Sequence, residues 1–338
     1  MTYTQCSDKL AEQLSGFTPI SVVVCTYNRV SSLRKTLESL GQMLVPPDLT
    51  WELIVVDNNS TDDTRVVVGD FTRTSGLNVR YVFEPKQGLS HARNAGVANS
   101  TGEIVAFIDD DVLILQQWLR ELARTFVQFD CIGVAGRIIP VWDGVTKPDW
   151  LATAGPYFLH GPIPDFDCGD EAKEIRSLPV GANMAFRKSA FAKYGFFRPD
   201  FGAGASSGTQ LGEDFEFCQR LIRAGERLVY SPQAVVFHPA VEKRITKGYY
   251  LHFYYDLGRM AIQLEGWPSE AVLYFGVPRY LYRSFLVKCV NWLFAFDKKK
   301  RFYCKARVYC VLGYIAEARK VKRDGSLRAQ TIQGTRVI

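Results

Sequence analysis

The sequence predicts an α/β fold in which a mostly parallel sheet is flanked by helices, and two patterns carry this prediction. Short runs of branched apolar residues alternate along the chain with segments whose apolar residues recur every three or four positions. The first two runs, residues 20–25 and 52–57, enclose one such segment, so strand, helix and strand succeed one another within about forty residues. A βαβ unit of this kind pairs its strands in parallel.

The other elements of the first half continue this alternation. The segment between the first two strands has an apolar stripe and a closing Pro-Pro pair, formed by Val30, Leu33, Leu37, Leu40, Leu44, Pro46 and Pro47. It therefore predicts a helix that ends before the prolines. We expect strands at residues 79–83 and 103–109, and helices at residues 88–100 and 115–127.

Regular patterning stops between residues 140 and 178, where nine Pro and Gly residues lie among several aromatic residues, Trp150 included. A loop this long in a compact domain is usually functional. The rings suit contacts with a sugar or lipid acceptor, or they hold the loop against the body of the protein. Beyond it, residues 179–191 predict a strand and a short helix. Residues 201–232 predict a loop rich in Gly and Ser, a helix starting near Gly212, and a strand.

Charge is distributed unevenly along the chain. The net charge is +6, but residues 1–270 hold 26 Lys and Arg against 32 Asp and Glu, whereas residues 271–338 hold 15 against 3. This asymmetry predicts a basic appendage on a slightly acidic body.

The cysteines, the N-terminus and the apolar runs indicate where in the cell the protein is located. The eight cysteines form no CxxC pair and show no metal-ligand spacing, which favours free thiols in a reducing environment. The N-terminus lacks the basic start and apolar core of a signal peptide, and no run of 18 uninterrupted apolar residues occurs. We therefore expect a cytoplasmic protein without a membrane-spanning helix.

Polar clusters follow three of the predicted strands, at residues 25–29, 57–64 and 109–111. Ligands of open parallel sheets bind beyond the carboxyl ends of the strands. Each cluster taken alone is equally compatible with an ordinary helix-capping turn, because Asp and Asn are common in such turns. Three clusters at one edge of the sheet favour a binding site.

The centre of this site is the run Asp109, Asp110 and Asp111. Side chains alternate along a strand, so Asp109 and Asp111 are expected to face one way, and Asp110 the other way, toward backbone or solvent. Two carboxylates on one face can share Mg²⁺ or Mn²⁺, and Mg²⁺ in proteins usually also contacts substrate phosphates. No phosphate-binding GxxxxGK[ST] occurs and no GxGxxG follows the first strand, so neither a P-loop nucleotidase nor a dinucleotide enzyme is supported.

Two further features carry candidate chemistry. Glu213 and Asp214 open a predicted helix, where acidic residues either stabilise the helix dipole or act as a general base toward an acceptor hydroxyl. Glycines just upstream, at 202, 204 and 208, would let that loop move over a substrate. His238 follows an apolar run at another strand end, where it is either structural or a metal ligand.

Six segments, in this order and spacing, resemble family 2 glycosyltransferases: ISVVVCTYNR, LIVVDNNSTDDT, GLSHARNAG, GEIVAFIDDDV, GANMAFRK and LGEDFEFCQRLIRAG. The resemblance covers roughly residues 18–240. It implies the Rossmann-like GT-A fold of nucleotide-diphospho-sugar transferases and inversion at the anomeric carbon, in an enzyme of the bacterial surface-glycan type.

The resemblance also assigns roles to individual residues. Contacts with the donor nucleotide fall to Thr26, Tyr27, Asn28, Arg29, Asp57, Asn59, Arg93, Asp109 and Asp110. The residues that match the metal ligands are Asp109, Asp111 and His238. Asp214 matches the catalytic base, with Glu213 as the first alternative. Contacts with the donor sugar and the acceptor are assigned to Gly181, Ala182 and Asn183. Trp150 of the long loop is a further candidate for an acceptor contact because of its aromatic ring, independently of the resemblance.

The implied organisation is an N-terminal tail at 1–16, a catalytic domain at 17–245 and a helical extension at 246–338. The catalytic domain divides into a nucleotide-binding half, about 17–115, and an acceptor half, about 130–245. The resemblance implies transfer of a sugar to a lipid-linked or surface glycan. No QxxRW follows His238, which favours transfer of one sugar per encounter.

Two other functions were weighed. A nucleotidyltransferase would need a Gly-rich basic loop after the first strand, and CTYNRVSSLRK contains no glycine. A catalytically silent membrane-associated binding protein would not need the intact acids Asp109, Asp111 and Asp214.

The C-terminal extension is basic and amphipathic. Residues 280–296 place several apolar side chains on one helical face, and a Lys/Arg-rich segment follows. Either two helices pack on the catalytic domain with a solvated basic rim, or a helix pair lies in the plane of an anionic membrane, at the inner face of the cell membrane. Nucleic acid is not expected as a partner, because the tail is rich in Leu, Phe, Val and Trp.

Overall fold

The computed structural model describes residues 18–176, 180–205 and 209–324, with side chains up to residue 320. These residues form two compact units. The first takes in residues 18–141, 164–205 and 213–239, and the second takes in residues 142–163, 209–212 and 240–324. Most of the long loop therefore groups with the C-terminal helices, although it was predicted to belong to the catalytic domain at 17–245.

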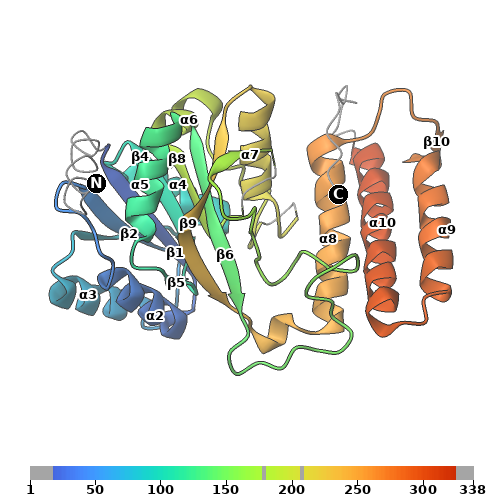
Figure 1. Ribbon diagram of the computed structural model, residues 1–338. Coiled ribbons are helices and arrows are strands. Elements are labelled where there is room, and N and C mark those ends of the chain that lie inside the picture. The colour runs from blue at the N-terminus through green and yellow to red at the C-terminus, as the bar shows by residue number, and fades with distance from the viewer. Residues whose placement is uncertain (1–17, 177–179, 206–208, 325–338) are drawn as a thin grey trace. The chain divides into compact units, whose positions relative to one another are not determined.

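The first unit is built on a nine-stranded sheet, within the described residues, whose order is β3-β2-β1-β4-β8-β6-β9-β5 with β7 on β9 (Figure 1). The strands are β1 (Ile20–Thr26), β2 (Trp51–Asp57), β3 (Val79–Phe83), β4 (Ile104–Asp109), β5 (Leu113–Ile114), β6 (Gly133–Val141), β7 (Lys173–Ile175), β8 (Asn183–Arg187) and β9 (Leu228–Pro239). Strands β1 to β4 are mutually parallel, as predicted. β8 then runs antiparallel to both β4 and β6, so the complete sheet is mixed.

Helices cover this sheet (Figure 1). They are α2 (Val30–Gly41), α3 (Thr64–Ser75), α4 (Leu89–Asn99), α5 (Trp118–Phe129), α6 (Lys188–Tyr194) and α7 (Glu213–Arg223). All but α3 were expected from the apolar periodicity. The first helix ends at Gly41, so Leu44, which was predicted to belong to its apolar stripe, lies outside the helix and is exposed. Three strands, β5, β6 and β7, were also not anticipated.

Close packing fixes helix α4 on the sheet. A Cβ atom at Gly96 would lie 2.4 Å from Cγ1 of Val23 on β1, a separation that real Cβ atoms do not show. Only glycine therefore lets α4 approach β1 this closely. The helix carries Arg93 one turn earlier, and this contact sets where that side chain enters the site.

The second unit is a layer of three helices with a small hairpin. Its elements are a 3₁₀ turn η1 (Glu242–Arg244), α8 (Lys247–Glu265), β10 (Leu273–Tyr274), β11 (Val277–Pro278), α9 (Arg279–Leu293) and α10 (Lys298–Asp324). Helix α10 lies between α8 and α9 (Figure 1). None of the described helices combines the length and the apolar character that crossing a bilayer requires.

Helices α8 and α10 touch through glycines. A Cβ atom at Gly258 would lie 2.0 Å from the Cys310 carbonyl oxygen, and one at Gly313 would lie within 2 Å of the Tyr255 carbonyl oxygen. Along α10, buried residues such as Phe302 and Ala306 continue this packing. Helix α10 is therefore part of a packed layer with α8, and contact of the C-terminal helices with a membrane stays a prediction.

Candidate active site

The three predicted polar clusters meet at the carboxyl edge of the parallel strands. Strand register places Thr26 of β1 beside Asp57 of β2, and Cys25 of β1 beside Asp109 of β4. The segments that follow these three strands therefore leave the sheet next to one another. The convergence that the sequence suggested is present in the structure.

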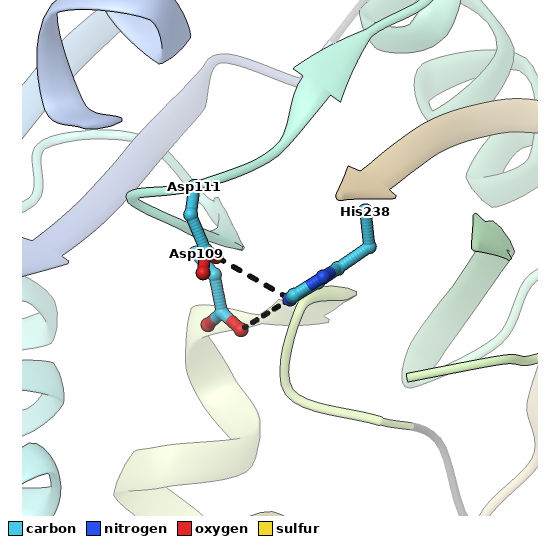
Figure 2. Close-up of side chains that lie close together, drawn as sticks. All are labelled: Asp109, Asp111 and His238. Carbon is cyan, nitrogen blue, oxygen red and sulfur yellow. Dashed lines mark ion pairs between the residues drawn. The ribbon is translucent and has the colours of Figure 1, made fainter. Parts of the chain in front are cut away.

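Asp109, Asp111 and His238 form a cluster that could hold a metal ion, since one ligand atom from each lies within 4.8 Å of the others. Figure 2 shows the three side chains directed toward one another. Nε2 of His238 lies 3.3 Å from Oδ1 of Asp111 and 3.9 Å from Oδ2 of Asp109. The histidine comes from the end of β9, more than a hundred residues after the aspartates. The structure thus brings together all three residues predicted to bind the metal.

The hydrogen bonding of His238 tests whether a cation fits here. Nδ1 lies 3.2 Å from the Pro239 carbonyl oxygen, which can only accept a hydrogen bond. This places the ring proton on Nδ1 and leaves a lone pair on Nε2, as is usual for histidines that bind metals. Nε2 is buried and forms no hydrogen bond with any residue that the structure describes. A lone pair facing two carboxylates is unfavourable unless a positive charge lies between them, and a hard divalent cation suits these three ligands.

Asp110 differs from the sequence prediction. Strand β4 ends at Asp109, so strict alternation does not extend to the next residue. Asp110 is buried rather than turned to backbone or solvent: Thr26 Oγ1 and Arg29 Nη1 each donate to its carboxylate at 2.7 Å. Arg29 Nη2 donates to Asp111 at 2.5 Å. Burial raises the pKa of Asp110 to about 7, although Arg29 opposes the shift. Arg29 therefore compensates two of the three aspartates.

A second arginine joins the aspartates to the acidic pair at the start of α7. Arg93 is buried, with Nη1 2.5 Å from Glu213 Oε1 and Nη2 3.8 Å from Asp109 Oδ1. The backbone N–H of Gly181 donates to Asp214 Oδ2 at 2.7 Å. A Cβ atom at Gly181 would lie 2.2 Å from Arg93 Nη2, so glycine is required here. The Arg93 guanidinium thus connects Asp109 of the candidate metal site with Glu213 of the acidic pair.

The pKa values of both acids, Glu213 and Asp214, are raised. Burial and the neighbouring Asp214 carboxylate raise the pKa of Glu213 to about 7, and Arg93 opposes the shift. Burial also raises the pKa of Asp214. A carboxylate with a raised pKa is a better proton acceptor for a hydroxyl group. Glu213 is occupied by Arg93, whereas Asp214 is held by backbone N–H groups, so the two residues are not equivalent.

The residues predicted to contact the donor nucleotide line the loops at this edge. Asp57 is buried and accepts hydrogen bonds from Ser60 N and from Tyr81 OH, at 2.8 and 2.7 Å. Burial and the Asp57 contact raise the pKa of Tyr81 to about 12. Asn28 and Asn59 both have left-handed backbones, with φ of 50° and 64°. Tyr27 is exposed beside them.

The predicted sugar contacts are only partly compatible with the structure. Gly181 and Ala182 lie in the segment that approaches Asp214. Asn183, however, has no exposed surface: it accepts from Trp118 Nε1 at 2.8 Å and donates to the Arg137 and Ala234 carbonyl oxygens. Its amide joins core elements, so its side chain does not offer the predicted sugar contact in this structure.

Trp150 lies in the second unit. Its ring centroid is 4.2 Å from that of Phe302 and 5.6 Å from that of Tyr250. Within that unit the ring holds the loop to helices α8 and α10, which is the alternative that the sequence left open. A contact between Trp150 and an acceptor stays a prediction.

One organising residue was missed. The Asn58 side chain is buried and donates to the carbonyl oxygens of Glu84 and Lys86, at 3.1 and 2.6 Å, and it accepts from Gly88 N at 2.8 Å. It thereby fixes the start of α4 and, with it, Arg93. The only signal for Asn58 in the sequence is weak: this residue stands in a polar cluster that was already assigned to the site.

Comparisons with known proteins bear on this arrangement. A sequence model of the family described as glycosyl transferase family 2 matches residues 21–195. A glucosyl-dolichyl phosphate glucuronosyltransferase of Haloferax volcanii is 32% identical over 230 residues, which span 67% of this chain and 70% of that protein. The succinoglycan biosynthesis protein ExoM of Rhizobium meliloti is 32% identical over 225 residues, or 67% of this chain and 68% of that protein.

Solved structures share the fold. A mannosyltransferase of Pyrobaculum calidifontis, in complex with GDP-Man and Mn²⁺, superposes with a TM-score of 0.53 at 18% identity over 93% of this chain and 78% of that chain. S. aureus TarS in complex with UDP gives a TM-score of 0.50 at 18% identity, over 91% of this chain and 92% of that chain. These similarities confirm the predicted GT-A fold.

Proposed function

Because the chain belongs to glycosyl transferase family 2 and is a glycosyltransferase, we propose that it moves one sugar per encounter from a nucleotide-diphospho-sugar to an acceptor hydroxyl, with inversion. One observation carries this proposal. The Asp109, Asp111 and His238 cluster stands at the same sheet edge as the Glu213–Asp214 pair, and Arg93 contacts both groups. Family membership favours glycosyl transfer over the nucleotidyltransferase alternative.

Asp109, Asp111 and His238 would hold Mg²⁺ or Mn²⁺. The cation would neutralise the charge that develops on the leaving diphosphate. The carboxylate oxygens favour a hard cation, and the imidazole nitrogen favours Mn²⁺ over Mg²⁺. Mn²⁺ in the Pyrobaculum calidifontis mannosyltransferase supports this choice.

Asp214 is proposed as the base that removes the acceptor proton. Its carboxylate is fixed by the backbone N–H groups of Gly181 and Phe215, at 2.7 and 2.8 Å. Glu213 is instead bound by Arg93, which reduces its availability as a proton acceptor. We therefore propose that Glu213 positions Arg93 and that Asp214 accepts the proton of the acceptor hydroxyl. The acceptor oxygen would attack the anomeric carbon in a single displacement.

The donor nucleotide is proposed to bind along the loops after β1 and β2. Asp57 would accept a hydrogen bond from the base, and Thr26, Tyr27 and Asn28 would line it. The Arg29 side chain is 31% exposed, although its guanidinium pairs with Asp110 and Asp111. Part of this side chain therefore remains accessible to a diphosphate. GDP-Man and UDP in the two structural neighbours support a nucleoside diphosphate at this site.

The acceptor is proposed to be a glycan or a lipid-linked sugar. The Haloferax volcanii relative is named for a dolichyl phosphate-linked substrate and the Rhizobium meliloti relative for succinoglycan biosynthesis. A lipid-linked acceptor would place the enzyme at a membrane surface. We propose a peripheral attachment at the cytoplasmic face of the cell membrane, through the C-terminal extension.

A panel of nucleotide sugars, incubated with the full chain and Mn²⁺, tests the donor. We expect at least one donor to release its nucleoside diphosphate, and EDTA to stop the release. Asp170→Asn removes a charge at an exposed acid far along the chain from the cluster. It is the control for a change of charge outside the metal site and should release nucleoside diphosphate as the wild type does. Metal-independent release from every active donor would overturn the metal-dependent mechanism.

A further inference from the structure

The outer side of helix α9 is apolar, and none of the residues that the structure describes covers it. In the three-helix layer of the second unit, α9 packs against α10 and is the outermost helix (Figure 1). Only Leu281 of this helix is fully buried. Leu286, Val290 and Leu293 recur at helical spacing on the other side and are all exposed, Leu286 by 64%. The apolar residues predicted to share one face therefore divide between a packed side and a bare side.

The hairpin that precedes α9 carries an unfavourable aromatic residue. Phe275 and Gly276 form the two-residue turn between β10 and β11, with φ of 51° and 84°. Such a turn favours Asn-Gly, because a bulky side chain is strained in the left-handed region. The Phe275 ring is also 91% exposed. Backbone and solvation both disfavour phenylalanine here, so a ligand that accepts the ring would explain the residue.

The turn at the other end of α9 repeats this pattern. Phe294 and Phe296 are exposed, Phe296 by 86%, and the basic run of residues 298–301 follows at once. Residues 272–301 contain seven Lys and Arg against one Asp. Arg279 and Arg283 of α9 are exposed as well. Exposed rings at both ends, an apolar stripe between them and an excess of cations therefore characterise one continuous stretch of chain.

We propose that this surface, the outer face of α9 with the two turns at its ends, binds an anionic lipid bilayer with α9 lying in the membrane plane. The inference rests on the proposed membrane attachment and specifies its surface. Aromatic and apolar residues would enter the headgroup region while Lys and Arg contact anionic lipids. Charge complementarity selects this occupant. A second copy would bring the same excess of cations against this one, although Lys298 is paired with Asp149, and like charges in close contact repel.

Flotation of the full chain with vesicles tests the proposal. We expect binding to vesicles of phosphatidylcholine with phosphatidylglycerol, little binding to phosphatidylcholine alone, and weaker binding at high salt. Phe275→Asn gives the turn its preferred residue, so it should preserve the fold while lowering vesicle binding about tenfold. Leu286→Gln should lower binding similarly. Leu44→Gln, at a residue of the first unit that is 58% exposed, is the matched control and should bind like the wild type.

Two results would overturn the proposal. One is equal flotation of the wild type, Phe275→Asn and Leu286→Gln. The other is a concentration-dependent dimer in sedimentation that Leu286→Gln abolishes without any vesicle binding, which would assign the face to a second copy. Donor hydrolysis measured without vesicles is independent of this surface. Failure of flotation with intact hydrolysis would therefore count against the membrane surface alone, and the converse against the proposed chemistry alone.

Discussion

The sheet edge of the first unit buries Asp110, Asp111 and Glu213, whereas helix α9 of the second unit leaves Leu286, Val290 and Leu293 in water. Proteins usually do the reverse, with charges outside and large apolar residues inside. At the sheet edge, Arg29 and Arg93 compensate the buried acids. Along α9, no described element covers the apolar face. Buried acids and exposed apolar residues both lower the stability of the protein without ligand. We have proposed a ligand for each of these two surfaces.

The two regions also differ in how they tolerate change. The acids of the first unit act through charge, so isosteric neutral variants test them with little loss of packing. Helices α8 and α10 of the second unit depend on close backbone contact at glycines. A Gly→Ala change, which adds one methyl group, therefore tests this contact. The predictions that follow use this difference, in order of decreasing effect.

The largest effect is expected for Asp111→Asn, which keeps the shape of the side chain and removes a proposed metal ligand. Transfer should fall about a thousandfold, because the cation supplies several kcal/mol of stabilisation to the transition state. Steady-state rates at saturating Mn²⁺ measure this. A variant with wild-type activity would mean that the buried acid serves the fold only.

Asp214→Asn should abolish most transfer, by about 10²–10⁴-fold, while donor binding is retained, since a general base contributes that much. Glu213→Gln removes the partner of Arg93 and should reduce transfer less. Single-turnover rates together with donor binding separate the two roles. If Glu213→Gln proves the more damaging change and Asp214→Asn keeps transfer, Glu213 is the base.

Gly258→Ala should destabilise the helical layer by about 1–3 kcal/mol, because the new methyl group overlaps the Cys310 carbonyl oxygen. Gly248→Ala, in the same helix, has nothing within 4 Å and should be neutral or stabilising by about 0.5 kcal/mol. Thermal unfolding of both variants measures the difference. Equal melting temperatures would show that α8 and α10 do not depend on this contact.

The smallest effect concerns pH. Burial raises the pKa of Glu213 from 4.5 to about 7, so the folded state binds the proton more tightly than the unfolded state. The free energy of unfolding should therefore decrease as pH rises from about 4.5 to about 7. Glu213→Gln should flatten that slope, and Glu174→Gln, at a half-exposed acid, should not. Urea titrations at several pH values measure it; an unchanged slope in Glu213→Gln would contradict the shift.

Much of this architecture follows from local sequence pattern. Strands β1, β2 and β4 are uninterrupted apolar runs, and their polar ends identified the site edge directly. Helix α3 escaped detection because only Thr64, Val67 and Val68 of it are buried, which leaves almost no apolar stripe. Strand β6 was missed because glycines and a proline interrupt its pattern, although its neighbours bury it.

The compensation of the buried acids could not be predicted in the same way. Arg29 reaches Asp110 across 81 positions of sequence, and Arg93 reaches Glu213 across 120. No local pattern encodes such pairs, so both arginines were assigned only as donor contacts. The end of β4 at Asp109, which releases Asp110 from strict alternation, is equally a property of the folded turn.

The central claim, that Asp109, Asp111 and His238 bind a divalent cation, is tested most directly by titrating Mn²⁺ into the full chain. Electron paramagnetic resonance follows the free ion. The wild type and His252→Gln, a change at a histidine whose side chain is 74% exposed, should remove the free-ion signal equally well. Asp111→Asn and His238→Gln should weaken binding about 10–100-fold or more. Equal Mn²⁺ affinity in all four proteins would contradict the assignment of the metal to this cluster.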